Sequence, residues 1–184
     1  MIQLRHIPNI ITIFRLFLIP PVAYAILKEQ YVAAFWLFGI AGFSDALDGF
    51  LARAFKWQSE LGATLDPIAD KTLMIVSFYC LYWQGVIPWW LFVVVLMRDL
   101  IIVVGASAYQ FVTRSLKMEP ILLGKFNTGV QILMIMALLA HLSYQFIPVK
   151  WVDSLAVILL ISTLVSGIAY VTIWLKKTRA ASSS

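Results

Sequence analysis

Residues 45–71 read DALDGFLARAFKWQSELGATLDPIADK, and they place four aspartates inside a chain that is otherwise overwhelmingly apolar. The aspartates are Asp45, Asp48, Asp66 and Asp70, and the cations Arg53 and Lys71 accompany them. A charge near the centre of a bilayer costs about 2.5–3.5 kcal/mol on insertion scales, so charges inside a membrane are usually functional and partnered. The residues on both sides of this stretch must explain why it is there.

The overall composition is that of a membrane protein. Of the 184 residues, 62% are hydrophobic and 12% are charged, with a mean hydropathy of +0.91. Soluble domains average about 45–50% apolar and about 25% charged residues. The length suits one domain, which we expect over residues 1–179, followed by a disordered tail at residues 180–184. The net charge of +5 comes from cations at segment ends, which favours anionic lipid headgroups as partners and excludes nucleic acid.

Six segments are long and apolar enough to span a bilayer, which takes about 20 mostly apolar residues. They are residues 8–27, 31–53, 63–84, 87–113, 121–146 and 151–175. One side collects Arg5, Arg53, Lys56, Arg114, Lys117, Lys176, Lys177 and Arg179, and the other has only Lys28 and Lys150. The positive-inside rule then places both termini in the cytoplasm. The expected fold is an all-α integral membrane protein, a six-transmembrane-helix bundle preceded by a short interfacial helix before Ile7.

The first apolar run is expected to stay in the chain as a span. Ala23-Tyr-Ala25 has the small residues of a signal-peptide cleavage site. However, Arg15 interrupts the apolar core that a signal peptide needs, and Pro20-Pro21 breaks it.

The four aspartates are expected to meet in one cavity near the cytoplasmic surface. Asp45 and Asp48 are three residues apart, so they lie on one face of a helix. Asp66 and Asp70 are four residues apart and are stacked on one face of the next helix. The short connection between the two helices lets them run antiparallel, which brings the two acidic faces together.

Four carboxylates this close require cations, because like charges repel and Arg53 and Lys71 can balance only two of them. Hard oxygen ligands in this number suit Mg²⁺, Mn²⁺ or Ca²⁺. No histidine or cysteine lies in the stretch, which argues against zinc. Two divalent ions can hold a pyrophosphate and stabilise both the attacking and the leaving oxygen. Gly49 and Gly62 leave room for a bulky ligand, and Arg53 offers a fork for phosphate.

The series Asp45-x2-Asp48-Gly49-x2-Ala52-Arg53-x8-Gly62-x3-Asp66-x3-Asp70 resembles, at every position, the signature of the CDP-alcohol phosphotransferases. Ile7-Pro8-Asn9, Thr12 and Arg15 resemble the opening of the bacterial glycerophospholipid members of that family. The family's six spans with cytoplasmic ends also match the expected fold. The resemblance implies an enzyme of phospholipid biosynthesis, which transfers a phosphatidyl group from CDP-diacylglycerol to an alcohol and releases CMP.

The resemblance also implies roles for the matching residues. The metal, two ions of Mg²⁺ or Mn²⁺, would be held by Asp45, Asp48, Asp66 and Asp70. Asp70 would in addition act as the base that takes the proton of the alcohol. The CDP moiety would be surrounded by Gly49, Ala52, Arg53 and Gly62. The enzyme would work as a homodimer in a bacterial cytoplasmic membrane, with its site facing the cytoplasm.

The acceptor is left open between glycerol 3-phosphate and phosphatidylglycerol. Arg98 in the fourth span and Lys125 in the fifth are expected to bind its phosphate, since an intramembrane arginine more often marks an anionic ligand than packing. We do not expect Arg98 to pair with Asp99, because adjacent helical residues do not face each other. The first three spans resemble bacterial phosphatidylglycerophosphate synthases. In contrast, Arg98-Asp99 followed later by Gly124-Lys125-x-Asn127-Thr128-x2-Gln131 resembles the CMP-forming cardiolipin synthases more closely.

Other functions fit the pattern less well. An inositol or serine derivative is an alternative acceptor. A membrane cation transporter could use an acidic cluster, but it would not need Gly49, Arg53 and Gly62 at these gaps, and no inverted repeat is visible. A membrane prenyltransferase also holds Mg²⁺-diphosphate on two aspartate-rich helices, but that class resembles longer bundles and lacks the Gly-x2-Ala-Arg continuation. A purely structural subunit has little reason to keep four buried acids.

Overall fold

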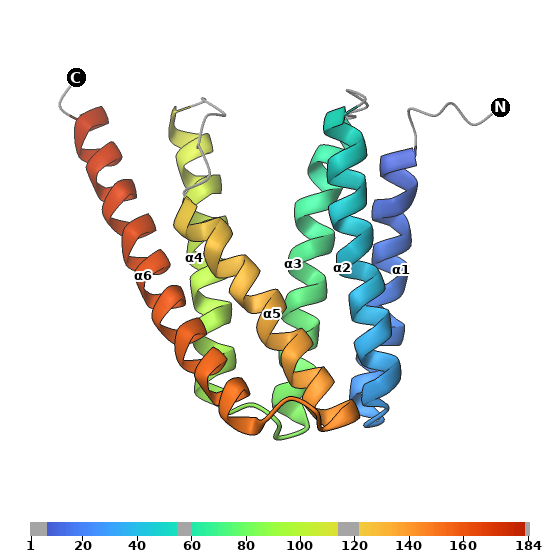
Figure 1. Ribbon diagram of the computed structural model, residues 1–184. Helices are drawn as coiled ribbons and strands as arrows, with labels where there is room; N and C mark the ends of the chain where they lie inside the picture. Colours follow the sequence, from blue (N-terminus) through green and yellow to red (C-terminus); the bar gives the residue numbers. More distant parts are fainter. Residues whose placement is uncertain (1–6, 55–59, 114–121, 183–184) are drawn as a thin grey trace. The chain divides into compact units, whose positions relative to one another are not determined.

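The computed structural model describes residues 7–54, 60–113 and 122–182, which form helices joined by short turns. The helices are α1 (Ile7–Leu27), α2 (Tyr31–Ala54), α3 (Glu60–Trp83), α4 (Trp89–Thr113), α5 (Leu122–Tyr144) and α6 (Val149–Ser182), as Figure 1 shows. Each overlaps one of the six predicted segments, so the all-helical fold is confirmed for these residues. The expected interfacial helix before Ile7 lies outside the described residues.

Three stretches in the described part of the chain are long and apolar enough to cross a membrane. They are Ile10–Leu27, Leu122–Tyr144 and Val149–Ile173. The aspartates of the signature lie on α2 and α3, where they lower the apolar content of both helices. This result supports an integral membrane protein, while the count of six spans and the cytoplasmic termini stay predictions.

The chain divides into two compact units. Unit 1 comprises Met1–Ile87 and Ile135–Val149, and therefore contains α1, α2, α3 and the second half of α5. Unit 2 comprises Pro88–Met134 and Lys150–Ser184, and therefore contains α4, the first half of α5 and α6.

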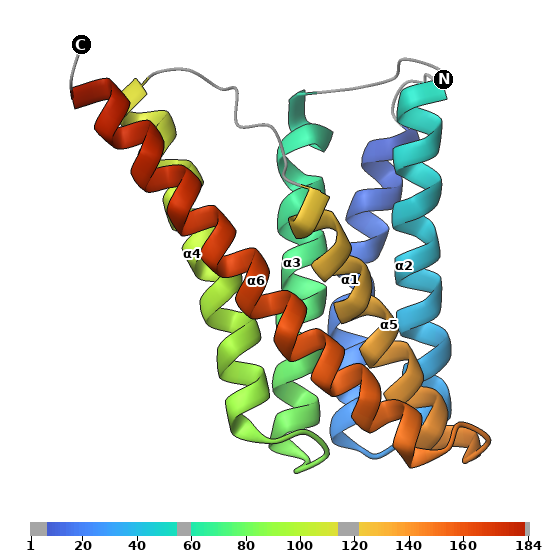
Figure 2. The same cartoon turned by 60° about the vertical axis from the view of Figure 1, so that its left-hand side comes forward.

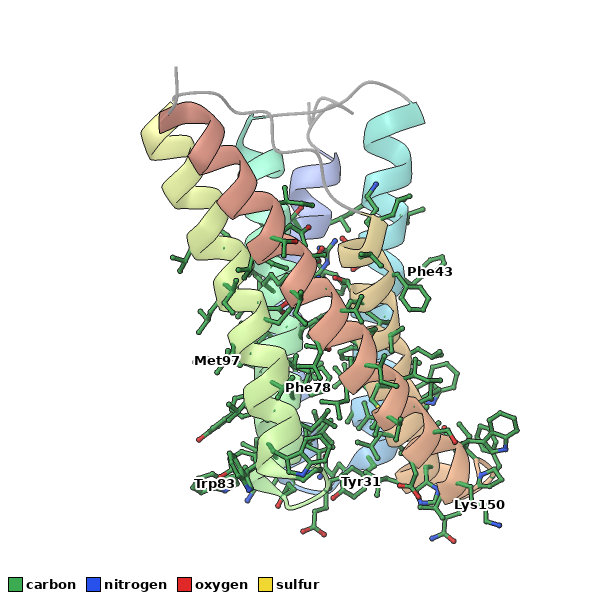
Figure 3. All side chains as sticks on the ribbon, turned by 90° about the vertical axis from the view of Figure 1, so that its left-hand side faces the viewer. Tyr31, Phe43, Phe78, Trp83, Met97 and Lys150 are labelled. Carbon is green, nitrogen blue, oxygen red and sulfur yellow. The ribbon has the colours of Figure 1, made fainter. Side chains whose placement is uncertain are left out.

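In unit 1, α1 packs against both α2 and α3, and α2 runs antiparallel to the other two (Figure 2). The core of this unit is built from Val22, Ile26, Phe38, Phe78 and Leu81, which are at most 2% exposed. Large apolar side chains also lie on the outside, where Phe43 projects away from α2 (Figure 3). An outward apolar face suits contact with lipid tails, which are as apolar as the side chains themselves.

Helix α1 continues through Pro20 and Pro21, in agreement with the single span predicted over residues 8–27. A proline inside a helix removes one backbone hydrogen bond and costs about 3 kcal/mol or more. The residues that follow, Val22 and Ile26, are fully buried against the rest of unit 1. Tertiary packing of this kind routinely outweighs local helix propensity, and we attribute the continuity of α1 to it.

In unit 2, polar contacts join α4 to α6 and α5 to α6. The apolar core of this unit includes Leu91, Val95 and Leu159, while Met97 points outward from α4 (Figure 3). Helix α6 ends at Ser182. The single domain over residues 1–179 and the disordered tail that follows it stay predictions.

Candidate active site

Asp45 and Asp70 lie at matching depths in two antiparallel helices of unit 1. At a rise of about 1.5 Å per residue, Asp45 lies about 14 Å before the end of α2 at Ala54. By the same measure, Asp70 lies about 15 Å after the start of α3 at Glu60. Arg15 lies about 12 Å into α1, which runs parallel to α3. Helix lengths alone therefore bring these three charged residues to one level.

Arg15 joins both carboxylates through a single nitrogen. Its Nη1 atom lies 2.8 Å from Asp45 Oδ1 and also donates a hydrogen bond to Asp70 Oδ1. The Arg15 side chain is 0% exposed, whereas the side chains of Asp45 and Asp70 are 40% and 41% exposed. A buried positive charge thus lies behind two carboxylates that keep part of their surface open. The prediction that the aspartates of α2 and α3 meet is confirmed for this pair.

The remaining residues of the signature lie on the same two helices. Those on α2 are Asp48, Gly49, Ala52 and Arg53, and those on α3 are Gly62 and Asp66. Their side chains lie outside the described part of the structure. The metal-binding and CDP-binding roles of these residues therefore stay predictions.

The two described carboxylates fit a hard divalent cation by their chemistry. Asp45 and Asp70 bring oxygen donors from two helices to one point, and Mg²⁺ and Mn²⁺ prefer such donors. No group of three or more His, Cys, Asp or Glu side chains occurs among the residues whose side chains are described. Asp48 and Asp66 are not among those residues, and they are the predicted third and fourth ligands.

Arg98 is the centre of a second polar cluster, which lies in unit 2. The residue is 4% exposed, and its Nη2 atom donates a hydrogen bond of 2.7 Å to Ser166 Oγ on α6. Nε donates to the same oxygen at 3.3 Å, and Nη2 also donates to the carbonyl oxygen of Gly124 at 3.4 Å. The Tyr170 ring lies near the guanidinium, with its centroid 5.8 Å from Cζ. One arginine of α4 therefore ties together residues of α5 and α6.

Arg98 also pairs with its neighbour Asp99, so the expectation that they would not pair is wrong. Arg98 Nη1 lies 2.7 Å from Asp99 Oδ1, and the Asp99 side chain is only 3% exposed. Adjacent helical residues leave the helix in different directions, but the long arginine stem lets the guanidinium turn back toward the aspartate. Burial supplies the reason, because a charge removed from water requires a partner.

Gly124 packs directly against the side chains of this cluster. A Cβ atom at this position would lie 2.7 Å from Tyr170 Oη and 3.3 Å from Arg98 Nη2. A Cβ at this position would require the Tyr170 side chain to shift, so glycine lets α5 lie close to the cluster. The next residue, Lys125, is exposed and adds a positive charge at the start of α5.

Two further polar residues of α5 are fully buried in the same unit. Asn127 accepts hydrogen bonds from Ser162 Oγ at 2.7 Å and Thr163 Oγ1 at 2.9 Å, both on α6. Its Nδ2 atom and both polar atoms of the Gln131 side chain make no hydrogen bond to any described residue. Because Asn127 and Gln131 are four residues apart, they continue one polar face of α5.

Sequence reasoning missed two features of these clusters. Arg15 was used against a signal peptide and for the family resemblance, but no contact with the aspartates was predicted for it, although a charge inside an apolar run carries the same energetic signal as the aspartates. Ser162, Thr163 and Ser166 on α6 were also missed. Their signal was their spacing of three to four residues within an apolar segment, which predicts a polar face on a helix.

Comparisons with known proteins point to one family. The sequence profile described as CDP-alcohol phosphatidyltransferase matches residues 5–175. The chain is 33% identical over 150 residues to the cardiolipin synthase (CMP-forming) of Rattus norvegicus, covering 73% of this chain and 50% of the relative.

Two other relatives are covered over more of their length. A probable phosphatidylglycerophosphate synthase of Mycobacterium tuberculosis is 33% identical over 175 residues, covering 92% of this chain and 81% of the relative. A CDP-diacylglycerol–glycerol-3-phosphate 3-phosphatidyltransferase of Aquifex aeolicus is 29% identical over 175 residues, covering 94% of each chain. By contrast, the chain spans half or less of the length of the cardiolipin synthases that it matches.

Proposed function

Because the chain belongs to the CDP-alcohol phosphatidyltransferase family, we propose that it transfers a phosphatidyl group from CDP-diacylglycerol to the hydroxyl of a glycerol-type acceptor. The proposed acceptor is glycerol 3-phosphate or phosphatidylglycerol. The names of the relatives from Aquifex aeolicus and Rattus norvegicus support an acceptor of this type.

The observation that carries the proposal is the meeting of Asp45 and Asp70 at Arg15. These two residues are the first and the last aspartate of the signature, and they come from different helices. Residues that are separate in the chain thus form one acidic site, which the chemistry of phosphate transfer requires.

The proposed reaction makes one bond and breaks one bond. The acceptor hydroxyl oxygen attacks the phosphorus that carries diacylglycerol, and its proton passes to the Asp70 carboxylate. The bond between that phosphorus and the oxygen bridging to the second phosphorus breaks, and CMP leaves with the electron pair. Asp70 suits this role because its side chain is 41% exposed and can be reached by a substrate.

Asp45, Asp48, Asp66 and Asp70 would hold the divalent ions, whose charge would neutralise the phosphate oxygens. Around them, Gly49, Ala52, Arg53 and Gly62 would accommodate the CDP moiety. The family resemblance and the helical placement of these residues support both assignments.

The acceptor's phosphate is assigned to Arg98 and Lys125. Two observations support this assignment: the exposed Lys125 follows Gly124 directly, and the Gly124 carbonyl accepts a hydrogen bond from Arg98. Within this proposal Arg98 has two tasks, because it also holds Asp99 and Ser166.

The proposed setting is a bacterial cytoplasmic membrane, crossed six times, with both termini and the acidic site on the cytoplasmic side. The distribution of lysine and arginine along the sequence supports this orientation. The proposed assembly is a homodimer, as the family resemblance implies, and cross-linking in native membranes tests it.

Mass spectrometry of the lipid products tests the proposed reaction. Purified protein with CDP-diacylglycerol and Mg²⁺ is offered glycerol 3-phosphate, phosphatidylglycerol, inositol or serine in separate reactions. We expect phosphatidylglycerophosphate from the first or cardiolipin from the second, with CMP in equal amount. A product only with inositol or serine would exclude a glycerol-type acceptor, and no CMP with any alcohol would contradict the transferase reaction.

A further inference from the structure

We propose that Arg15 is the internal counter-cation of the acidic site and holds Asp45 and Asp70 together when no divalent ion is bound. The inference rests on the proposed function, because that function assigns the metal to these carboxylates. Arg15 lies on α1, outside the signature on α2 and α3, and it would keep the two carboxylates of the signature in position. Arg15 is then a positioning residue.

Asp45 and Asp70 share one nitrogen atom of Arg15. Nη1 of Arg15 contacts an oxygen of Asp45 at 2.8 Å and also contacts an oxygen of Asp70. Two carboxylates that share one nitrogen lie close enough to repel each other strongly, because the Coulomb energy rises as the separation falls. The guanidinium is the positive charge that both of them contact.

Arg15 and the two aspartates differ in exposure to solvent. Arg15 is 0% exposed, whereas the two aspartate side chains are 40% and 41% exposed. The arginine therefore approaches the carboxylates from the buried side, and their open surface is left for a ligand. A divalent ion would reach them from the opposite direction, so a fixed cation inside and an exchangeable cation outside can share the two carboxylates.

The positive charge of Arg15 is permanent. An arginine guanidinium stays protonated in proteins, even when it is buried. It needs no ion from solution, so the site has a balancing charge before metal and CDP-diacylglycerol arrive. Without Arg15, the stability of unit 1 should depend on the divalent ion.

The test is a cycle of variants measured by thermal unfolding in detergent, followed by the fluorescence of the chain's 7 tryptophans. In EDTA, Arg15→Met should lower the unfolding temperature by about 5–10 °C, since removing one partner of a buried ion pair is strongly destabilising. Arg15→Met/Asp45→Asn removes one of the two repelling charges and should recover at least half of that loss. A double variant as unstable as Arg15→Met, or less stable, would overturn the inference.

A second set of measurements compares the unfolding temperatures in EDTA and in Mg²⁺ at matched ionic strength. If Arg15 and the ion serve the same carboxylates, Mg²⁺ should raise the unfolding temperature of Arg15→Met more than that of the unaltered protein. Equal, non-zero gains would contradict the inference, because lost packing alone lowers stability equally with and without the ion. No gain in either protein would contradict the metal assignment of the proposed function, and the cycle in EDTA would still decide the role of Arg15.

Arg15→Lys covers the case in which Arg15→Met does not fold. It keeps the charge and should unfold within a few degrees of the unaltered protein in EDTA. If Arg15→Met yields no folded protein, folded Arg15→Met/Asp45→Asn supports the inference. The inference fails if neither Arg15→Met nor Arg15→Met/Asp45→Asn folds and the unfolding temperature of Arg15→Lys falls by about 5–10 °C or more. In that case the positive charge of Arg15 does not account for the stability of the site.

Discussion

Asp45 of α2 and Asp70 of α3 meet at one atom, Nη1 of Arg15, although they lie on different helices. Their meeting follows from the helix lengths, which place both residues about 14–15 Å from the connected ends of α2 and α3. The acidic site therefore depends on the relative position of α2 and α3, and α1 joins them through Arg15.

Gly124→Ala should destabilise the protein, because the added Cβ would lie 2.7 Å from Tyr170 Oη. Overpacking of this kind costs about 1–3 kcal/mol, against a gain of about 1 kcal/mol from alanine's better helix propensity. Gly129→Ala is the matched control, since nothing lies within 4 Å of its added Cβ, and it should be neutral or stabilising. Thermal unfolding distinguishes the two, and equal effects of the two substitutions would contradict the close packing at Gly124.

Lys125→Met should weaken the acceptor and leave CDP-diacylglycerol unaffected. A hydrogen bond to a charged group is worth about 1.5–3 kcal/mol, so the acceptor KM should rise by roughly 10- to 100-fold. Lys150→Met removes another exposed lysine, at the start of α6, and serves as the control. An acceptor KM that is the same in both variants would remove Lys125 from the acceptor site.

Arg98→Ala should lower both stability and acceptor affinity. It leaves the Asp99 carboxylate, 3% exposed, without its arginine, and breaking such a buried pair costs about 3–5 kcal/mol. Arg98→Met/Asp99→Asn removes the buried negative charge as well, and its thermal stability should recover in part. Its acceptor KM should stay high. If the KM of this double variant equalled that of the unaltered protein, Arg98 would have only a structural role.

The helices could be predicted well from the sequence, whereas the internal ion pairs could not. Apolar segments bounded by charges and prolines locate the six helices, because the length of a span is fixed by bilayer thickness. The meeting of two aspartates follows from helical spacing and a short connection. Arg15 was missed because only Arg53 and Lys71, the cations within residues 45–71, were counted against the acids.

The pairing of Arg98 with Asp99 was predicted wrongly for a different reason. The rule about adjacent residues concerns the directions of side chains leaving a helix, but it ignores how far a long side chain can turn back. Burial favours the pair, because neither buried charge is solvated by water and each therefore requires the other as its partner. Such a contact depends on the surrounding helices, and a single sequence does not specify their packing.

The rate of CMP release by Asp70→Asn tests whether Asp70 is the general base of the proposed reaction. An amide cannot accept the proton of the attacking hydroxyl, and loss of a general base costs about 10²–10⁴-fold in rate. The variant should bind CDP-diacylglycerol and lose turnover by that factor. Asp153→Asn is the control, since Asp153 is an exposed aspartate on α6.

The measurement is the rate of CMP release with CDP-diacylglycerol, Mg²⁺ and the preferred acceptor. We expect the unaltered protein and Asp153→Asn to release CMP at the same rate, and Asp70→Asn to fall at least about 100-fold below them. Release of CMP by Asp70→Asn at the rate of the unaltered protein would contradict the account.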